Sequence, residues 1–102
     1  MGTITKRDLV VQISDQTGLT QHQVFDVLQL FLDNVTSHLA QNNEVVLRNF
    51  GTFEIRVAKA KIGRNPNAPA KDVAIPERAI VKFKPGKELK EKVASLLPEL
   101  KQ

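Results

Sequence analysis

Residues 56–71 read RVAKAKIGRNPNAPAK, a stretch that carries five basic residues and no acidic one. It has too few large apolar side chains to form part of a core. Its beginning, residues 56–61, and the following residues 73–75 suit β-strands, whereas residues 63–69 are rich in turn-forming Gly, Asn and Pro. We therefore expect a long hairpin that projects from a sheet. At the rise of a β-strand, the distance from Arg56 to Pro66 would be about 30 Å.

The charge of the chain is distributed unevenly around this arm. Residues 1–55 carry three basic and six acidic side chains, a net charge of −3, and residues 56–102 carry twelve and five, a net charge of +7. A basic half on an acidic body is typical of a protein that contacts a polyanion with one surface. Nucleic acid is the leading candidate for that polyanion.

Length and composition limit the class of protein. The 102 residues fit one domain, and a hydrophobic content of 41% predicts that it folds. A domain this small buries little surface alone, so a partner subunit would help it. The absence of cysteine excludes disulfides, thiolate zinc sites and a cysteine nucleophile. No apolar run approaches the length of a membrane span, and we expect a soluble, intracellular protein.

Two helices are predicted before the arm. Thr5 and Asp8 have the spacing of a capping box ahead of a helix over residues 6–17, and Gly18 suits the left-handed residue after it. Thr20 and Gln23 form a second capping box. The next helix has a stripe at steps of three and four residues, widened by further apolar positions that favour burial against a second subunit. The stripe consists of Val24, Leu28, Phe31, Val35 and Leu39, and the widening positions are Val27, Leu30 and Leu32.

The remaining chain predicts a sheet and a last helix. Alternating apolar residues around 45–47, 53–57 and 79–83 indicate three strands, the first two joined by a turn at residues 49–51. A helix follows from Lys87 to about Leu97 and is ended by Pro98. The predicted fold is therefore α+β: a helical base formed by an αα-hairpin, a three-stranded antiparallel sheet extended into a β-arm, and a C-terminal helix.

Three segments in this order resemble the bacterial histone-like family of HU and integration host factor. They are residues 48–54, RNFGTFE; residues 63–66, GRNP; and residues 81–90, VKFKPGKELK. The resemblance runs from about Thr5 to Val93, and the start at residues 6–9, KRDL, agrees with it. It implies an intertwined dimer whose two arms embrace double-stranded DNA in the minor groove and bend it, as is generally known for these architectural proteins.

The resemblance divides one domain, residues 1–102, into parts with expected roles. They are a helical base (about 5–40), a sheet and saddle (about 44–57 and 74–84), a DNA-gripping arm (about 56–76) and a C-terminal helix (about 87–97). Pro66 matches the family's proline wedge between base pairs. Ala68 and Pro69 depart from the threonine and glycine that often follow it. The expected DNA-binding residues are Arg56, Lys59, Lys61, Arg64, Asn65, Pro66, Asn67, Lys71, Arg78, Lys82, Lys84 and Lys87.

The resemblance also implies the partners. We expect a homodimer or a heterodimer with a paralogue, associated with the nucleoid in the cytoplasm, with little sequence preference, although a preference like that of integration host factor stays open. We expect no enzymatic activity, cofactor, metal, membrane contact or small-molecule substrate. His22 and His38 lack metal-ligand spacing, and Ser14, Asp15 and His22 match no catalytic signature.

Three other interpretations of the residues remain. Residues 6–40 could be a helix-turn-helix unit that reads bases through Gln21, His22 and Gln23. Phe50, Phe53 and Phe83 could stack on the bases of single-stranded nucleic acid, although their place in apolar strand patterns favours core packing. In a third interpretation, the arm binds an acidic protein.

Overall fold

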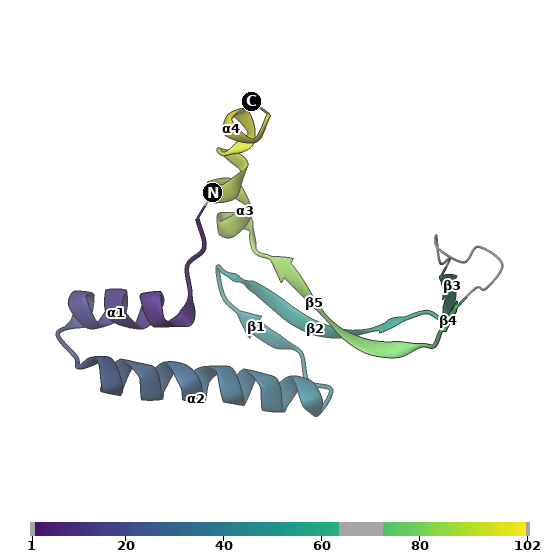
Figure 1. Ribbon diagram of the computed structural model, residues 1–102, viewed down its shortest axis with the longest axis horizontal. Coiled ribbons are helices and arrows are strands. Elements are labelled where there is room, and N and C mark those ends of the chain that lie inside the picture. Colours follow the sequence, from purple (N-terminus) through teal and green to yellow (C-terminus); the bar gives the residue numbers. More distant parts are fainter. Residues whose placement is uncertain (1, 64–72, 102) are drawn as a thin grey trace. The chain divides into compact units, whose positions relative to one another are not determined.

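A computed structural model describes residues 2–63 and 73–101, and the chain separates into two compact units, Met1–Ser37 and His38–Gln102. Among the described residues, no helix is both long and apolar enough to cross a membrane. Figure 1 shows the elements along the chain. They are α1 (Lys6–Thr17), α2 (Gln21–Ala40), β1 (Val45–Leu47), β2 (Gly51–Ala58), β3 (Lys61–Gly63), β4 (Val73–Ile75), β5 (Arg78–Pro85), α3 (Lys87–Ala94) and α4 (Leu97–Leu100).

Both predicted capping boxes are confirmed. The backbone N–H of Asp8 donates to Thr5 Oγ1 at 3.2 Å, and the Thr5 N–H donates to the Asp8 carboxylate at 3.0 Å. Thr20 and Gln23 make the same reciprocal pair at 3.1 and 3.0 Å. Gly18 has a φ of 78°, the left-handed conformation that glycine adopts without steric cost. These local bonds determine where α1 begins and ends and where α2 begins.

The apolar stripe of α2 is only partly covered within the chain. Val24 and Leu39 are buried, and Leu28 and Val35 are half-buried. The widening positions are exposed, with Val27 at 67% and Leu30 at 62%. Packing within this chain therefore accounts for one side of the stripe and leaves the other in contact with solvent.

The sheet has the strand order β1-β2-β5 and is antiparallel throughout. The pairs include Val45 with Phe53 and Phe53 with Phe83, so these three residues lie in one row across the sheet. Gly51 is needed beside them: a Cβ there would lie 2.5 Å from the Phe83 ring and 2.7 Å from the Lys84 carbonyl oxygen. The predicted α+β fold with three antiparallel strands is confirmed.

The strands of the expected arm are interrupted rather than continuous. β2 and β5 pair as far as Ala58 and Arg78, and β3 and β4 resume at Lys61 and Ile75. Two residues lie between these pairs on each strand, 59–60 and 76–77, so both ladders keep one register. Pro76 lies in the gap, and its lack of an N–H removes a donor from the ladder. The arm therefore leaves the sheet as a second, separate two-stranded ribbon (Figure 1).

The last helix is shorter than predicted. α3 ends at Ala94, not near Leu97, and Pro98 lies inside the short helix α4 instead of ending α3. The physical reason is that Pro98 has no N–H for the carbonyl four residues earlier, which is that of Ala94, and its ring would clash there. The chain therefore turns at residues 95–96 and starts a new helix with the proline in its first turn.

Candidate nucleic-acid interface

The strand register places the two kinds of side chain on opposite faces of the sheet. Alternate residues of a strand point to opposite faces, and directly paired residues share a face. One face, named here the apolar face, carries Phe53, Ile55, Val57, Ala79, Val81 and Phe83. The other, named here the basic face, carries Thr52, Glu54, Arg56, Ala58, Arg78, Ile80, Lys82 and Lys84.

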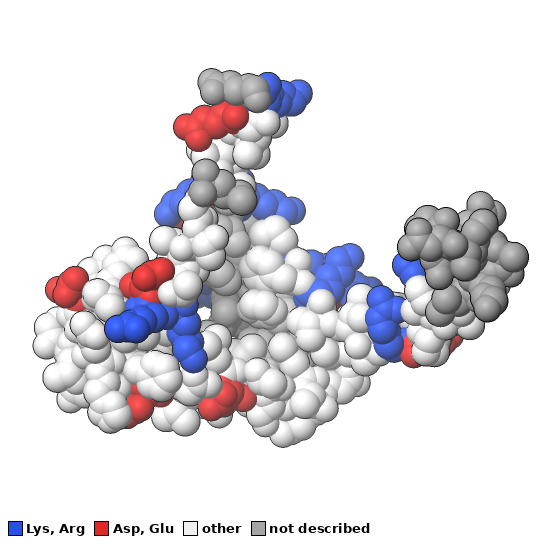
Figure 2. Space-filling model, in the orientation of Figure 1, with Lys and Arg blue, Asp and Glu red and all other residues white. Residues whose placement is uncertain are grey.

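The basic face brings together four of the expected DNA-binding residues. Arg56 comes from β2, and Arg78, Lys82 and Lys84 come from β5. All four are exposed, and Figure 2 shows Lys and Arg side chains gathered along this part of the sheet. With Glu54 as the one acid among the described strand residues of this face, its net charge is four minus one, or +3. The register therefore brings cations from two strands together on one face of the sheet.

Glu54 lies within this surface and binds two of its cations. Its Oε1 accepts hydrogen bonds from Arg56 Nε at 2.8 Å and pairs with Arg56 Nη2 at 2.8 Å and Lys84 Nζ at 3.2 Å. The bonds from Arg56 and then from Lys84 hold the pKa of the Glu54 carboxyl below its ordinary value. Sequence reasoning did not single out Glu54. The signal was present, because Glu54 and Arg56 are two residues apart and so share a face.

The other expected residues are divided between the arm and the last helix. Lys59 lies in the interruption and Lys61 begins β3, and both are exposed. Because β3 belongs to a separate ladder, the alternation in β2 does not determine the face on which Lys61 lies. Lys87 is the first residue of α3. Five expected residues lie outside the described part of the chain, namely Arg64, Asn65, Pro66, Asn67 and Lys71.

Lys87 follows a backbone contact between the sheet turn and α3. The Gly86 N–H donates to the Phe50 carbonyl at 2.8 Å, which holds the start of α3 beside the β1–β2 turn. Gly86 is the N-cap and offers no side-chain cap. A cation at the first position of a helix is disfavoured by the helix dipole, so Lys87 does not serve the stability of α3. Its position is better suited to contact an anion.

The phenylalanines form a ring cluster with one another. The centroids of Phe53 and Phe83 are 4.8 Å apart, and those of Phe50 and Phe83 are 5.6 Å apart, with tilted planes. Such offset pairs stabilise packing in folded domains. Phe53 and Phe83 belong to the apolar face, so the cluster favours core packing over base stacking.

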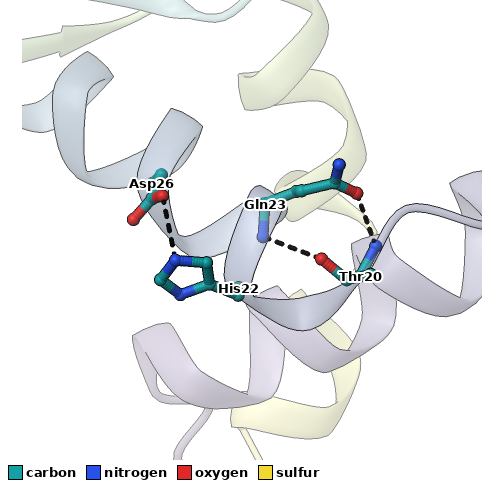
Figure 3. A network of polar contacts seen from close by, with 4 residues as sticks. All are labelled: Thr20, His22, Gln23 and Asp26. Atoms are coloured by element: carbon teal, nitrogen blue, oxygen red, sulfur yellow. Dashed lines mark hydrogen bonds and ion pairs between the residues drawn. The ribbon is translucent and has the colours of Figure 1, made fainter.

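The start of α2 is the part that a helix-turn-helix interpretation would place against bases. Figure 3 shows that the Gln23 side chain turns back to Thr20, where its Oε1 accepts the backbone N–H. His22 Nε2 lies 3.4 Å from a carboxylate oxygen of Asp26. An acid at this point opposes phosphate, so the geometry gives this interpretation little support. The described residues hold no cluster of three or more His, Cys, Asp or Glu side chains suited to a metal.

Comparison with known proteins gives consistent matches. The family model described as bacterial DNA-binding protein matches residues 4–94. The integration host factor subunit alpha of Marinomonas sp. is 37% identical over 99 residues, 97% of this chain and 100% of that protein. The DNA-binding protein HU of Thermotoga maritima is 41% identical over 90 residues, 88% of this chain and 99% of that protein.

Solved structures agree with the sequence matches. A structure of Anabaena HU crystallised with DNA has a TM-score of 0.82 at 33% identity, and the match covers 89% of this chain and 98% of that one. HU of Thermotoga maritima has a TM-score of 0.63 at 28% identity over 88% of this chain and 98% of that one. The similarity therefore spans helices, sheet and arm together. The chain belongs to the bacterial DNA-binding protein family, the family of HU and integration host factor.

Proposed function

We propose that this chain is a non-enzymatic architectural protein that binds double-stranded DNA in the minor groove and bends it as a dimer. The observation that carries the proposal is the basic face, on which the strand register gathers Arg56, Arg78, Lys82 and Lys84. The crystals of the similar Anabaena HU with DNA support DNA as the polyanion. The location that follows from this role is the nucleoid.

The basic face supplies affinity through phosphates. Each phosphate that a Lys or Arg neutralises releases condensed counterions, which favours binding at low salt. The same contacts carry no sequence information, so the proposed binding has little sequence preference. Lys59 and Lys61 add exposed cations beyond the sheet, where they could contact further phosphates.

The proposed wedge is Pro66, which lies outside the described residues. A proline ring is compact, apolar and stiff, so it can fill the gap of a partly unstacked base step with little loss of side-chain entropy. Unstacking costs a few kcal/mol per step. Phosphate contacts of the basic face and arm offset that cost, and the resulting bend brings more of the DNA backbone against the protein.

The exposed apolar surface supports a dimer. Val27 and Leu30 on α2 are 67% and 62% exposed, and Val81 on the apolar face is 56% exposed. Exposed apolar residues that gather on a helix and on a sheet face mark surfaces suited to association. Burial of these residues against a second copy or a paralogue would remove that surface from water. Sedimentation of the purified chain, alone and with its paralogue, measures which pairing forms.

The first test measures binding to duplex DNA over a range of salt concentrations. Affinity should fall steeply as salt rises, with log affinity linear in log salt, because counterion release drives binding. Competition by single strands and by an acidic protein of similar charge provides the control. If duplex DNA is not the best competitor, single-strand or protein binding replaces this proposal.

The second test measures bending directly by ring closure of short DNA fragments. Wild type should accelerate closure, and Pro66→Ala should lose most of that effect while keeping the salt-dependent affinity. Ala68→Gly serves as a control at the same tip without touching the wedge. Equal ring closure by wild type and Pro66→Ala would remove the wedge from the mechanism.

A further inference from the structure

Glu54 is unusual because a carboxylate occupies the middle of a surface proposed to bind a polyanion. It pairs in register with Lys82 and lies between Thr52 and Arg56 on the same face. An acid there repels phosphate, so affinity alone gives no reason for its presence. Its contacts suggest a different role.

The geometry shows that Glu54 holds two cations while it is itself covered. One oxygen, Oε1, contacts Arg56 at 2.8 Å and Lys84 at 3.2 Å. The Glu54 side chain is 15% exposed, whereas those of Arg56 and Lys84 are each 51% exposed. The Lys84 contact therefore joins β5 to β2, the Arg56 contact lies within β2, and both cations still present about half of their side-chain surface to solvent.

We propose that Glu54 is a positioning residue that competes with DNA phosphates for Arg56 and Lys84. In the free protein it fixes both side chains on the sheet, and on binding the phosphates take over part of their hydrogen bonds. This inference rests on the proposed function, because it concerns the same face and the same ligand.

The competition has a consequence that salt dependence can measure. A cation already paired with Glu54 neutralises less phosphate charge than an unpaired one and so releases fewer condensed counterions from DNA. It therefore contributes less than a full phosphate contact to the salt slope. Lys82 lies on the same face and makes no ion pair among the described residues, so it should contribute fully. The pairing of Arg56 and Lys84 with Glu54 therefore lowers the affinity for DNA and also lowers the sensitivity of that affinity to salt.

The main test compares Glu54→Gln with Glu77→Gln by titration of a duplex at several salt concentrations. Both variants remove one negative charge. Glu77 is the control because it is exposed in the interruption beside β5 and has no ion pair among the described residues. From about 50 to 200 mM salt, one phosphate contact changes affinity by roughly 3.5-fold, which is 4 raised to about 0.9. E54Q should bind the duplex more tightly than E77Q at low salt. Over this salt range its affinity should fall by roughly 3.5-fold more than that of E77Q.

A conservative variant separates charge from shape. Glu54→Asp keeps the carboxylate and should retain a slope close to that of wild type. Equal slopes for E54Q and E77Q would overturn the proposal, because only the general charge would then matter. Weaker binding by E54Q would also overturn it, since Glu54 would then assist the cations.

A second pair of variants tests the proposal without changing Glu54. Lys84→Gln removes a paired cation and Lys82→Gln removes an unpaired one, two residues apart on the same strand and face. K82Q should reduce the salt slope by about 0.9, and K84Q should reduce it by clearly less. Equal reductions of the salt slope by K82Q and K84Q would overturn the proposal that Glu54 competes with phosphates, while the proposed binding of duplex DNA would stand. Failure of the proposed function would appear instead as a wild type that does not bind duplex DNA with a salt-dependent affinity.

Discussion

The two faces of the β2–β5 pair share one backbone and differ in almost everything else. On one face, Phe53 and Phe83 pack ring against ring at 4.8 Å. On the other, Arg56 and Lys84 stand half exposed around Glu54. Ile80 and Phe83 form a matched pair for comparing the faces, because both are 36% exposed on the same strand but lie on opposite faces.

The difference teaches that one strand can serve stability and binding separately. Apolar contacts stabilise in proportion to the area they remove from water, so the apolar face should control unfolding and assembly. Exposed ion pairs contribute little to stability, so the basic face should control DNA affinity. Variants of each face should therefore change different measurements.

The largest expected effect comes from the apolar face. Phe83→Ala removes the ring that both Phe50 and Phe53 contact, and should lower the free energy of unfolding by about 2–4 kcal/mol. Urea unfolding at fixed protein concentration measures the change. Ile80→Ala is the control, since it removes a smaller, equally exposed side chain from the basic face and should cost less. A larger loss for Ile80→Ala would contradict the assignment of the faces.

A smaller effect is expected from the basic face, in binding alone. Arg78→Gln should reduce the salt slope of DNA affinity by about 0.9, because one phosphate contact is lost. Its free energy of unfolding should stay within about 0.5 kcal/mol of wild type. Titration of a duplex at several salt concentrations, with thermal unfolding in parallel, measures both. A destabilised Arg78→Gln would show that the two faces are not separable.

The smallest expected effect is a pH dependence. Arg56 and then Lys84 lower the pKa of the Glu54 carboxyl from its ordinary value of 4.5. A lowered native pKa adds stability above the unfolded value and loses it as pH falls through the native value. Wild type should therefore lose this contribution below pH 4.5, and Glu54→Gln should not. Thermal unfolding across that range measures the difference. Asp8→Asn is the comparison, because the backbone N–H and then the side chain of Thr5 lower the pKa of the Asp8 carboxyl, so this variant should remove a contribution of the same sign.

Local signals were sufficient for the first two helices and for the two faces of the sheet. The capping boxes at Thr5 and Thr20 depend on atoms three residues apart, and Gly18 depends on its own φ. Alternation in residues 79–83 predicted an apolar and a basic side of the last strand. Such features need no information about distant residues, which explains why the sequence predicts them well.

Features that depend on two distant segments were missed or only half predicted. The arm was expected to be continuous. Whether Pro76 interrupts a ladder depends on the residues opposite it, and strand pairing determines those residues. The end of α3 was missed for a local reason instead: Pro98 acts on the carbonyl four residues earlier, that of Ala94, so α3 ends before Leu97. The grip of Glu54 on Lys84 joins residues 30 apart in the chain, which only strand pairing brings within 3.2 Å.

The sequence by itself determined both ends of α1, the start of α2, the alternating strands, the acid-free stretch over residues 56–71 and the family. Only the tertiary structure decided the register between β2 and β5, the break in the arm and the place of Glu54 among the cations. The reason is physical. Caps and alternation arise from backbone geometry within a few residues, whereas register and ion pairing arise from contacts between strands that the chain brings together only on folding.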